Sequence, residues 1–336
     1  MDCKLASKHS IPKSKLFVSC DLVGSTHFKQ TEPGWQKIFL SFYWEFPQFI
    51  HEANRVQAEI DGGQTAFRLW KAVGDELIFE VLVGDEAAVS RAVRVWIRAI
   101  DEYEKQVLID RKLALKGGAF IATFPGPDSE STVPIDPGEG QSDEPVVHQN
   151  AKALSGQRAP TKYLYDYFGP SVDTGFRIFG HSSRRYFTLS VEVAWAISLA
   201  AHSAAGQKVG FETHTTKDFV FRGAHVLKGV WRAREYPIFA IDRESRDAVN
   251  EAVSAMNGSA ISASKIIDVC HACATDENWP FSLYLPNSTN EAFQVEPEDA
   301  MAGLYHSEPT LEGAETVDRV SLRAGEDLIP ANTPLG

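Results

Sequence analysis

Short apolar segments alternate with longer amphipathic segments between residues 15 and 241, and their order limits the possible folds more than any other feature of the sequence. The order of the first six is strand, helix, strand, strand, helix, strand. The predicted strands cover 15–20, 66–69, 76–83, 113–124, 186–193, 218–226 and 236–241, and the predicted helices cover 35–54, 87–107, 171–181 and 194–205; an ordered segment of unassigned type is expected at 163–168. This order predicts an α+β fold with a ferredoxin-type βαββαβ core, in which a mixed sheet carries its helices on one face.

Two segments interrupt or follow this pattern. Residues 125–160 are rich in Pro, Gly, Ser and acidic residues without a regular apolar period, and we expect a long polar loop or insertion there. Residues 244–336 contain 16 acidic and 4 basic side chains, which accounts for the whole net charge of −12. We therefore expect a catalytic domain over 1–243, with the insertion inside it, and an acidic, partly helical C-terminal extension over 244–336.

The charge distribution excludes some partners. Residues 1–243 are neutral overall, which argues against a duplex nucleic acid as a partner. The sequence begins with a basic segment that no apolar stretch follows, and its longest apolar run, around 191–201, is too short to span a bilayer. We expect a cytoplasmic protein that does not enter the membrane. Cys270 and Cys273 have the spacing of half a zinc site, and the sequence favours two structural thiols over that alternative.

Two carboxylates follow the ends of predicted strands. Asp21 comes directly after the buried segment 15–20, and Asp75 lies in the tight turn of the predicted hairpin. Carboxylates at such positions suit hard cations such as Mg²⁺ or Mn²⁺, which prefer oxygen ligands. Gly24, Ser25 and Thr26 form a turn of small residues after Asp21, and its backbone N–H groups could hold a phosphate. The alternative for this segment is an ordinary turn with a capping Asp.

Phosphate chemistry also needs cations. Arg177 and Lys228 lie in elements that could supply them, although each alone could equally be a surface cation.

Together these motifs resemble those of the class III nucleotidyl cyclases. The segment 21–26 (DLVGST) resembles their first metal motif, and 71–75 (KAVGD) resembles the turn that carries a base-contacting Lys and the second metal Asp. Asp166, Asp173 and Arg177 match the spacing of a third motif, although Asp173 stands where purine cyclases usually have Asn. The segment 222–229 (RGAHVLKG) matches the strand that carries the triphosphate-binding Lys.

The resemblance implies a two-metal mechanism. Asp21, Asp75 and the Leu22 carbonyl group would bind two Mg²⁺ or Mn²⁺ ions, and the ribose 3′-oxygen would attack the α-phosphorus. Arg177 would stabilise the transition state, Asp173 would contact the ribose, and Lys228 would hold the triphosphate. The resemblance also implies a homodimer in which each active site combines residues of two subunits.

Within this family the chain most resembles the pyrimidine cyclases of Pycsar antiphage defence. The resemblance lies in the sequences of 74–79 (GDELIF) and 173–177 (DTGFR) and in the polar insertion. That resemblance implies UTP or CTP as the substrate, and an effector protein that binds the cyclic UMP or cyclic CMP product. Because a pyrimidine is small, we expect Tyr43 to narrow the base pocket, with a core aromatic as the alternative. Lys71 and Asp166 keep the pair that binds adenine, so an adenylate cyclase and a non-catalytic nucleotide-sensing domain remain alternatives.

Overall fold

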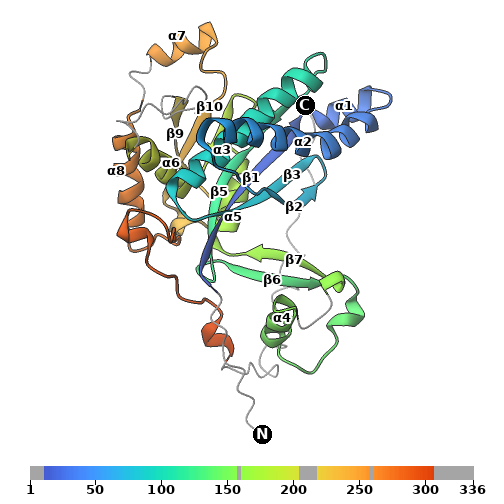
Figure 1. Cartoon of the computed structure of the whole chain (residues 1–336), viewed down its shortest axis with the longest axis vertical. Coiled ribbons are helices and arrows are strands. Elements are labelled where there is room, and N and C mark those ends of the chain that lie inside the picture. Colours follow the sequence, from blue (N-terminus) through green and yellow to red (C-terminus); the bar gives the residue numbers. More distant parts are fainter. Residues whose placement is uncertain (1–10, 157–159, 204–217, 257–260, 306–336) are drawn as a thin grey trace, which may run out of the picture. The chain divides into compact units, whose positions relative to one another are not determined.

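The computed structural model describes residues 11–156, 160–203, 218–256 and 261–305, and it shows an α+β fold (Figure 1). The strands are β1 (Lys13–Val23), β2 (Arg68–Val73), β3 (Glu76–Val83), β4 (Ala114–Lys116), β5 (Gly118–Phe124), β6 (Ser129–Pro134), β7 (Tyr163–Phe168), β8 (Tyr186–Leu189), β9 (Phe219–Val226) and β10 (Glu235–Asp242). The α-helices are α1 (Ser25–Thr31), α2 (Gln36–Asp61), α3 (Glu86–Tyr103), α4 (Val146–Leu154), α5 (Pro170–Phe179), α6 (Val191–Ser203), α7 (Ala248–Met256) and α8 (Ala263–Ala274).

The main sheet has the strand order β2-β3-β1-β5-β8-β10-β9, and β4 adds to the end of β1. β1 is antiparallel to β3, β4 and β5, whereas β5 and β8 are parallel. The predicted α+β class and mixed sheet are therefore confirmed. The single strand expected over 113–124 is divided at Gly117 into β4 and β5, and a Cβ atom at that position would lie 2.0 Å from the Ser19 carbonyl oxygen, so only glycine fits there.

The two faces of the main sheet are covered differently. Side chains of β1 point alternately to the two faces, as strand geometry requires. Leu16, Val18 and Cys20 pack with α2, α3, α6 and α8 in the larger hydrophobic cluster, while Phe17 packs with α5 on the other side. Most helices thus share one face, as expected. The prediction that all helices lie on that face is wrong for α5, which packs on the opposite one.

Helix α2 continues through Pro47 although a proline inside this segment predicts a kink or break. Its buried residues recur every three or four positions and form one apolar stripe that packs beside α3; they are Ile38, Phe39, Phe42, Phe46, Ile50 and Ala53. Burial of this stripe offsets the hydrogen bond that proline removes. Helix α3 has a capped N-terminus, because the Asp85 side chain accepts from the Ala88 N–H at 2.7 Å.

The chain divides into two compact units. One comprises residues 1–131 and 165–300, and the other comprises 132–164 and 301–336. The sequence-based boundary at 243 differs from this division, since α8 packs against α6 and buries Cys270 and Cys273. The segment 125–160 is not the loop that the sequence predicts, because it contains β6 and α4. Helix α4 was not predicted from the sequence because Ala153 is its one buried residue, which leaves a weak apolar period. Residues 306–336 of the acidic extension lie outside the described residues.

No helix within the described ranges has the length and apolar character needed to cross a membrane.

Candidate active site

Asp21 and Asp75 lie next to each other at one end of the β1–β3 pair. Asp21 is near the end of β1, opposite Glu76 of β3, and Asp75 occupies the turn that joins β2 to β3. The Leu22 N–H donates to the Asp75 carbonyl oxygen at 3.2 Å, which holds this turn against β1. Gly74 makes the tight turn possible, because its φ of 62° lies in the left-handed region. Both predicted metal ligands therefore belong to one cluster.

Three carboxylates and one ammonium group interact in this cluster. The Lys116 ammonium of β4 lies 3.0 Å from Oδ2 of Asp21. Burial raises the pKa of Asp21; the hydrogen bond and charge of Lys116 oppose that shift, and the negative charge of Asp75 adds to it. Burial, and then the charge of Asp21, raise the pKa of Glu76. The cluster carries more negative than positive charge when its carboxylates are ionised.

This donor set fits a divalent cation in charge and in chemistry. Oxygen ligands that repel one another are stabilised when a hard cation lies between them. Across the part of the chain that the structure describes, no three His, Cys, Asp or Glu side chains form a ready-made metal cluster. Two carboxylates and the Leu22 carbonyl group, with water and substrate oxygens, are thus the ligands that this end of the sheet offers.

The predicted turn after Asp21 is shorter than expected, because Ser25 and Thr26 already belong to α1 and only Gly24 makes the turn. Gly24 adopts φ 85° and precedes α1, whose first residue, Ser25, is 5% exposed, whereas Thr26 is exposed. A Cβ atom on Gly24 would approach the Lys112 carbonyl oxygen at 3.2 Å, so both space and conformation favour glycine.

Lys71 and Asp166 form the ion pair that the sequence places in the base pocket. Their Nζ and Oδ1 atoms are 2.8 Å apart, and both side chains are about one-third exposed. Trp70 also donates its Nε1–H to Oδ1 of Asp166, at 3.1 Å. Neighbouring side chains of a regular strand point to opposite faces, but the register of β2 shifts between Leu69 and Lys71, so both Trp70 and Lys71 reach Asp166.

Tyr43 contacts the same turn as Asp75. It lies on α2, is 36% exposed, and donates its hydroxyl hydrogen to the Gly74 carbonyl oxygen. Its hydroxyl group thus connects α2 to the turn that carries Asp75. The alternative, a core aromatic, would require a buried side chain, whereas Tyr43 lies at the surface.

Helix α5 carries Asp173 and Arg177. Nη1 of Arg177 donates to the Asp173 carbonyl oxygen at 2.6 Å, and the Asp173 side chain is exposed. The helix is fixed by a residue that follows β5 and by one within β5. Oδ1 of the fully buried Asp128 accepts from the Ser171 N–H at 2.9 Å, and a Cβ atom on Gly175 would lie 2.1 Å from the Phe120 ring.

Lys228 is exposed in the turn that follows β9. Its neighbour Gly229 lies beside the guanidinium group of Arg177, because a Cβ atom on Gly229 would be 3.9 Å from Nη2 of that residue. The two predicted phosphate-binding cations thus belong to adjoining segments. Among the described residues, no hydrogen bond or ion pair joins either of them to Asp21 or Asp75.

Comparisons with known proteins found similarity in structure only. No protein-family model matches the chain, and no curated protein matches it in sequence. The adenylyl cyclase CyaB from P. aeruginosa is 13% identical over 68% of this chain and 94% of its own, with a TM-score of 0.45. The guanylate cyclase domain of RhGC from Catenaria anguillulae, solved with GTP, is 9% identical over 70% of this chain and 100% of its own, with a TM-score of 0.43. The guanylyl cyclase Cya2 is 15% identical over 68% of this chain and 92% of its own, with a TM-score of 0.40.

The sequence did not single out Lys116, Glu76, Trp70 or Asp128. The pairing of Lys116 with Asp21 depends on the β1–β4 register across 95 positions, which no local pattern encodes. Asp128 lies in a segment without periodicity, and its role depends on the distant helix α5.

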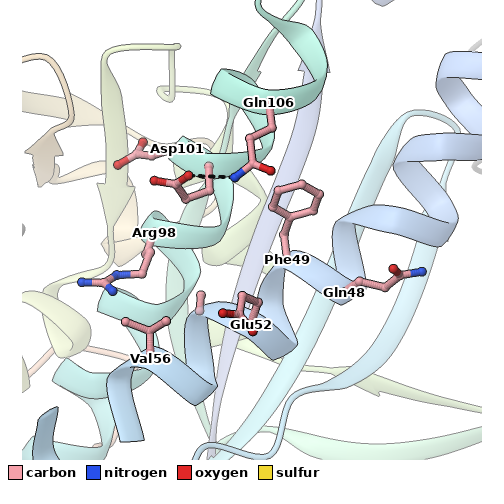
Figure 2. A pocket seen from close by; sticks show the side chains of 9 residues that line it. Gln48, Phe49, Glu52, Val56, Arg98, Asp101 and Gln106 are labelled. Carbon is pink, nitrogen blue, oxygen red and sulfur yellow. Dashed lines mark hydrogen bonds between the residues drawn. The ribbon is translucent and has the colours of Figure 1, made fainter. Parts of the chain in front are cut away.

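A hollow of about 620 Å³ lies between α2 and α3, and none of the candidate site residues lines it (Figure 2). It is lined by Gln48, Phe49, Glu52, Ala53, Val56, Arg98, Asp101, Glu102 and Gln106, none of which the sequence assigned to the site. Two of the lining residues are joined by a hydrogen bond, which Gln106 donates to Glu102 one helical turn earlier at 2.9 Å.

Proposed function

We propose that this protein is a nucleotidyl cyclase that converts UTP or CTP to the 3′,5′-cyclic nucleotide and pyrophosphate, as a signal generator in bacterial antiphage defence. The observation that carries the proposal is the position of Asp21 beside Asp75. The Leu22 N–H to Asp75 carbonyl distance is 3.2 Å, and the charge of Asp75 raises the pKa of Asp21. Neighbouring carboxylates at the end of a sheet are suited to cation-assisted phosphate chemistry.

Asp21, Asp75 and the Leu22 carbonyl group would hold two divalent cations, Mg²⁺ or Mn²⁺. When bound, these ions would lower the pKa of the ribose 3′-hydroxyl group and neutralise charge on the triphosphate. The 3′-oxygen then forms a bond to the α-phosphorus, the bond from that phosphorus to the leaving pyrophosphate breaks, and the hydroxyl proton is released to solvent.

The cations of the chain act on the phosphates. Arg177 donates to the oxygens on which charge develops in the transition state, and an interaction that is stronger there than in the ground state raises turnover. Lys228, next to Gly229, holds the triphosphate, and the N–H groups of the turn 24–26 orient it. Asp173 accepts from the ribose.

The base is recognised by Lys71 and Asp166, with Tyr43 narrowing the pocket. The Lys71–Asp166 ion pair presents a donor and an acceptor together, which suits the polar edge of a base. This pair also favours a second candidate, an adenylate cyclase that uses ATP, because such an edge can bind adenine as well.

The active site would be completed by a second copy of the chain. Within the described part of one subunit, neither Arg177 nor Lys228 contacts the carboxylate pair, so two subunits arranged head to tail can bring the groups together. Large apolar side chains near these residues are exposed, as a subunit interface requires; they are Leu69, Val73, Phe168 and Phe176.

The substrate is tested by incubating the purified protein with UTP, CTP, ATP or GTP and Mn²⁺, and by separating the products chromatographically. We expect a cyclic pyrimidine nucleotide and pyrophosphate from the wild type and none from Asp75→Ala. Asp110→Ala, which changes an exposed aspartate outside the cluster, is the matched control and should keep full activity. Faster turnover of ATP would favour the second candidate, and full activity of Asp75→Ala would refute the role of the carboxylates.

The shared site is tested by mixing inactive variants. Asp75→Ala and Arg177→Ala each lack a different half of the site, so a mixed dimer contains one intact site. We expect activity to return on mixing, up to about one quarter of the wild-type value for random pairing. Two Asp75→Ala preparations mixed together are the control. Absence of recovery after subunit exchange has been demonstrated by mass spectrometry contradicts the composite site.

A further inference from the structure

Lys116 occupies a fixed position beside the candidate metal ligands. It is the last residue of β4, and the register of β4 with β1 places it opposite Asp21. The next residue, Gly117, passes so close to β1 that a Cβ atom there would lie 2.0 Å from the Ser19 carbonyl oxygen. The backbone around Lys116 is therefore tightly held, and the side chain reaches Asp21 without any change in the sheet.

The ammonium group of Lys116 acts on more than one carboxylate. It lies 3.0 Å from Oδ2 of Asp21, and its positive charge also acts on Glu76. Asp75 adds its negative charge to the same cluster. A cation at this point offsets the repulsion among the three carboxylates, which is what a bound metal ion would also do.

The Lys116 ammonium and a divalent cation compete for Asp21, because both are attracted to its carboxylate group and their positive charges repel each other. The Lys116 side chain is 34% exposed and can move toward solvent when the ion pair breaks, whereas Asp21 is fixed in β1. The ion pair with Lys116 therefore opposes the approach of a metal ion to Asp21, and movement of Lys116 toward solvent relieves that opposition.

We propose that Lys116 is an internal counter-ion of the metal-free enzyme and competes with the catalytic divalent cation for Asp21. This inference rests on the proposed function. Lys116 holds the carboxylate cluster together before metal binds and weakens the binding of metal in the absence of nucleotide. It is a positioning residue, since it acts through Asp21 and not on the substrate.

The test measures Mn²⁺ binding without nucleotide, by loss of the electron paramagnetic resonance signal of free Mn²⁺. Lys116→Met keeps the length of the side chain and removes its charge. We expect it to bind Mn²⁺ about fivefold more tightly than the wild type, as expected for loss of a partly exposed ion pair. Lys116→Arg should bind as weakly as the wild type. Lys105→Met removes a surface lysine that pairs with Glu102 and should leave binding unchanged.

A second measurement separates competition from a merely structural role. Without metal, Lys116→Met should melt at a lower temperature than the wild type, and Mn²⁺ should raise its melting temperature more than that of the wild type. Equal or weaker Mn²⁺ binding by Lys116→Met overturns this inference while leaving the proposed function intact. Equal binding by Asp21→Asn and the wild type, or no binding by any of these proteins, overturns the metal site and this inference with it.

Discussion

Replacing Glu192 by glutamine should stabilise the protein at alkaline pH. Glu192 lies in the first turn of α6, is 5% exposed, and its Oε1 atom has no hydrogen-bond partner among the described residues. Burial raises the pKa of this carboxyl group from 4.5 to about 7, and the charge of Asp128 adds to the shift. The ionised side chain is therefore a cost to the native state.

The sign and size of the effect follow from linkage. A carboxyl group whose folded-state pKa is raised binds its proton more tightly in the native than in the unfolded state. Its cost is small below pH 4.5, grows as the pH rises, and is complete above pH 7. At about 1.4 kcal/mol per pKa unit, the full cost is about 3 kcal/mol. Glu192→Gln should thus gain up to about 3 kcal/mol at pH 8 and less than about 1 kcal/mol at pH 5.

Urea unfolding followed by circular dichroism at pH 5 and pH 8 measures both differences. Glu32→Gln, at an exposed position, is the matched control and should change stability by less than about 0.5 kcal/mol at either pH. The variant will retain part of the pH dependence, because burial also raises the pKa of Asp128, to about 6. The reasoning is refuted if Glu192→Gln is no more stable than the wild type at pH 8, or if its gain is the same at both pH values.

Three further predictions concern the candidate site. Gly175→Ala should destabilise the protein by about 1–3 kcal/mol in urea unfolding, because the added methyl group would lie 2.1 Å from the Phe120 ring; no loss would show that α5 is free to move. Lys71→Ala and Asp166→Ala should each raise KM for the nucleotide, and the double variant should be no worse than the single ones; additive losses in KM would contradict a shared role of the pair. Tyr43→Phe should lower kcat and change the melting temperature little, because it releases the Gly74 carbonyl group in the turn that carries Asp75. An unchanged kcat would exclude that role.

The elements that the sequence predicted well are those with a local signal. The buried run before Asp21 and the tight turn that carries Asp75 each depend on neighbouring residues, and both are present in the structure. The ends of the strands were not predicted: β1 continues past Asp21 to Val23, and β2 covers Arg68–Val73 instead of 66–69, because pairing with neighbouring strands sets where a strand ends.

The features that the sequence did not predict depend on distant contacts. The predicted strand 186–193 is a strand only to Leu189, because α6 begins at Val191 with the same apolar composition. Helix α8 belongs to the core through contacts with α6 that lie about 70 residues away in the chain, so the acidic composition around it suggested a separate extension. The shift in register of β2 that directs Trp70 and Lys71 to the same side is likewise a property of strand pairing.

The arrangement of the candidate residues shows how motifs that are weak in the sequence come together in the fold. Each motif alone is compatible with an ordinary turn or surface charge. The sheet brings Asp21, Asp75 and Lys116 into one cluster, and α5 carries Arg177 beside Gly229 in another. Carboxylates that repel each other reduce stability unless a cation compensates them, and Lys116 supplies one positive charge beside Asp21, Asp75 and Glu76, which is the reason for proposing a cation site there.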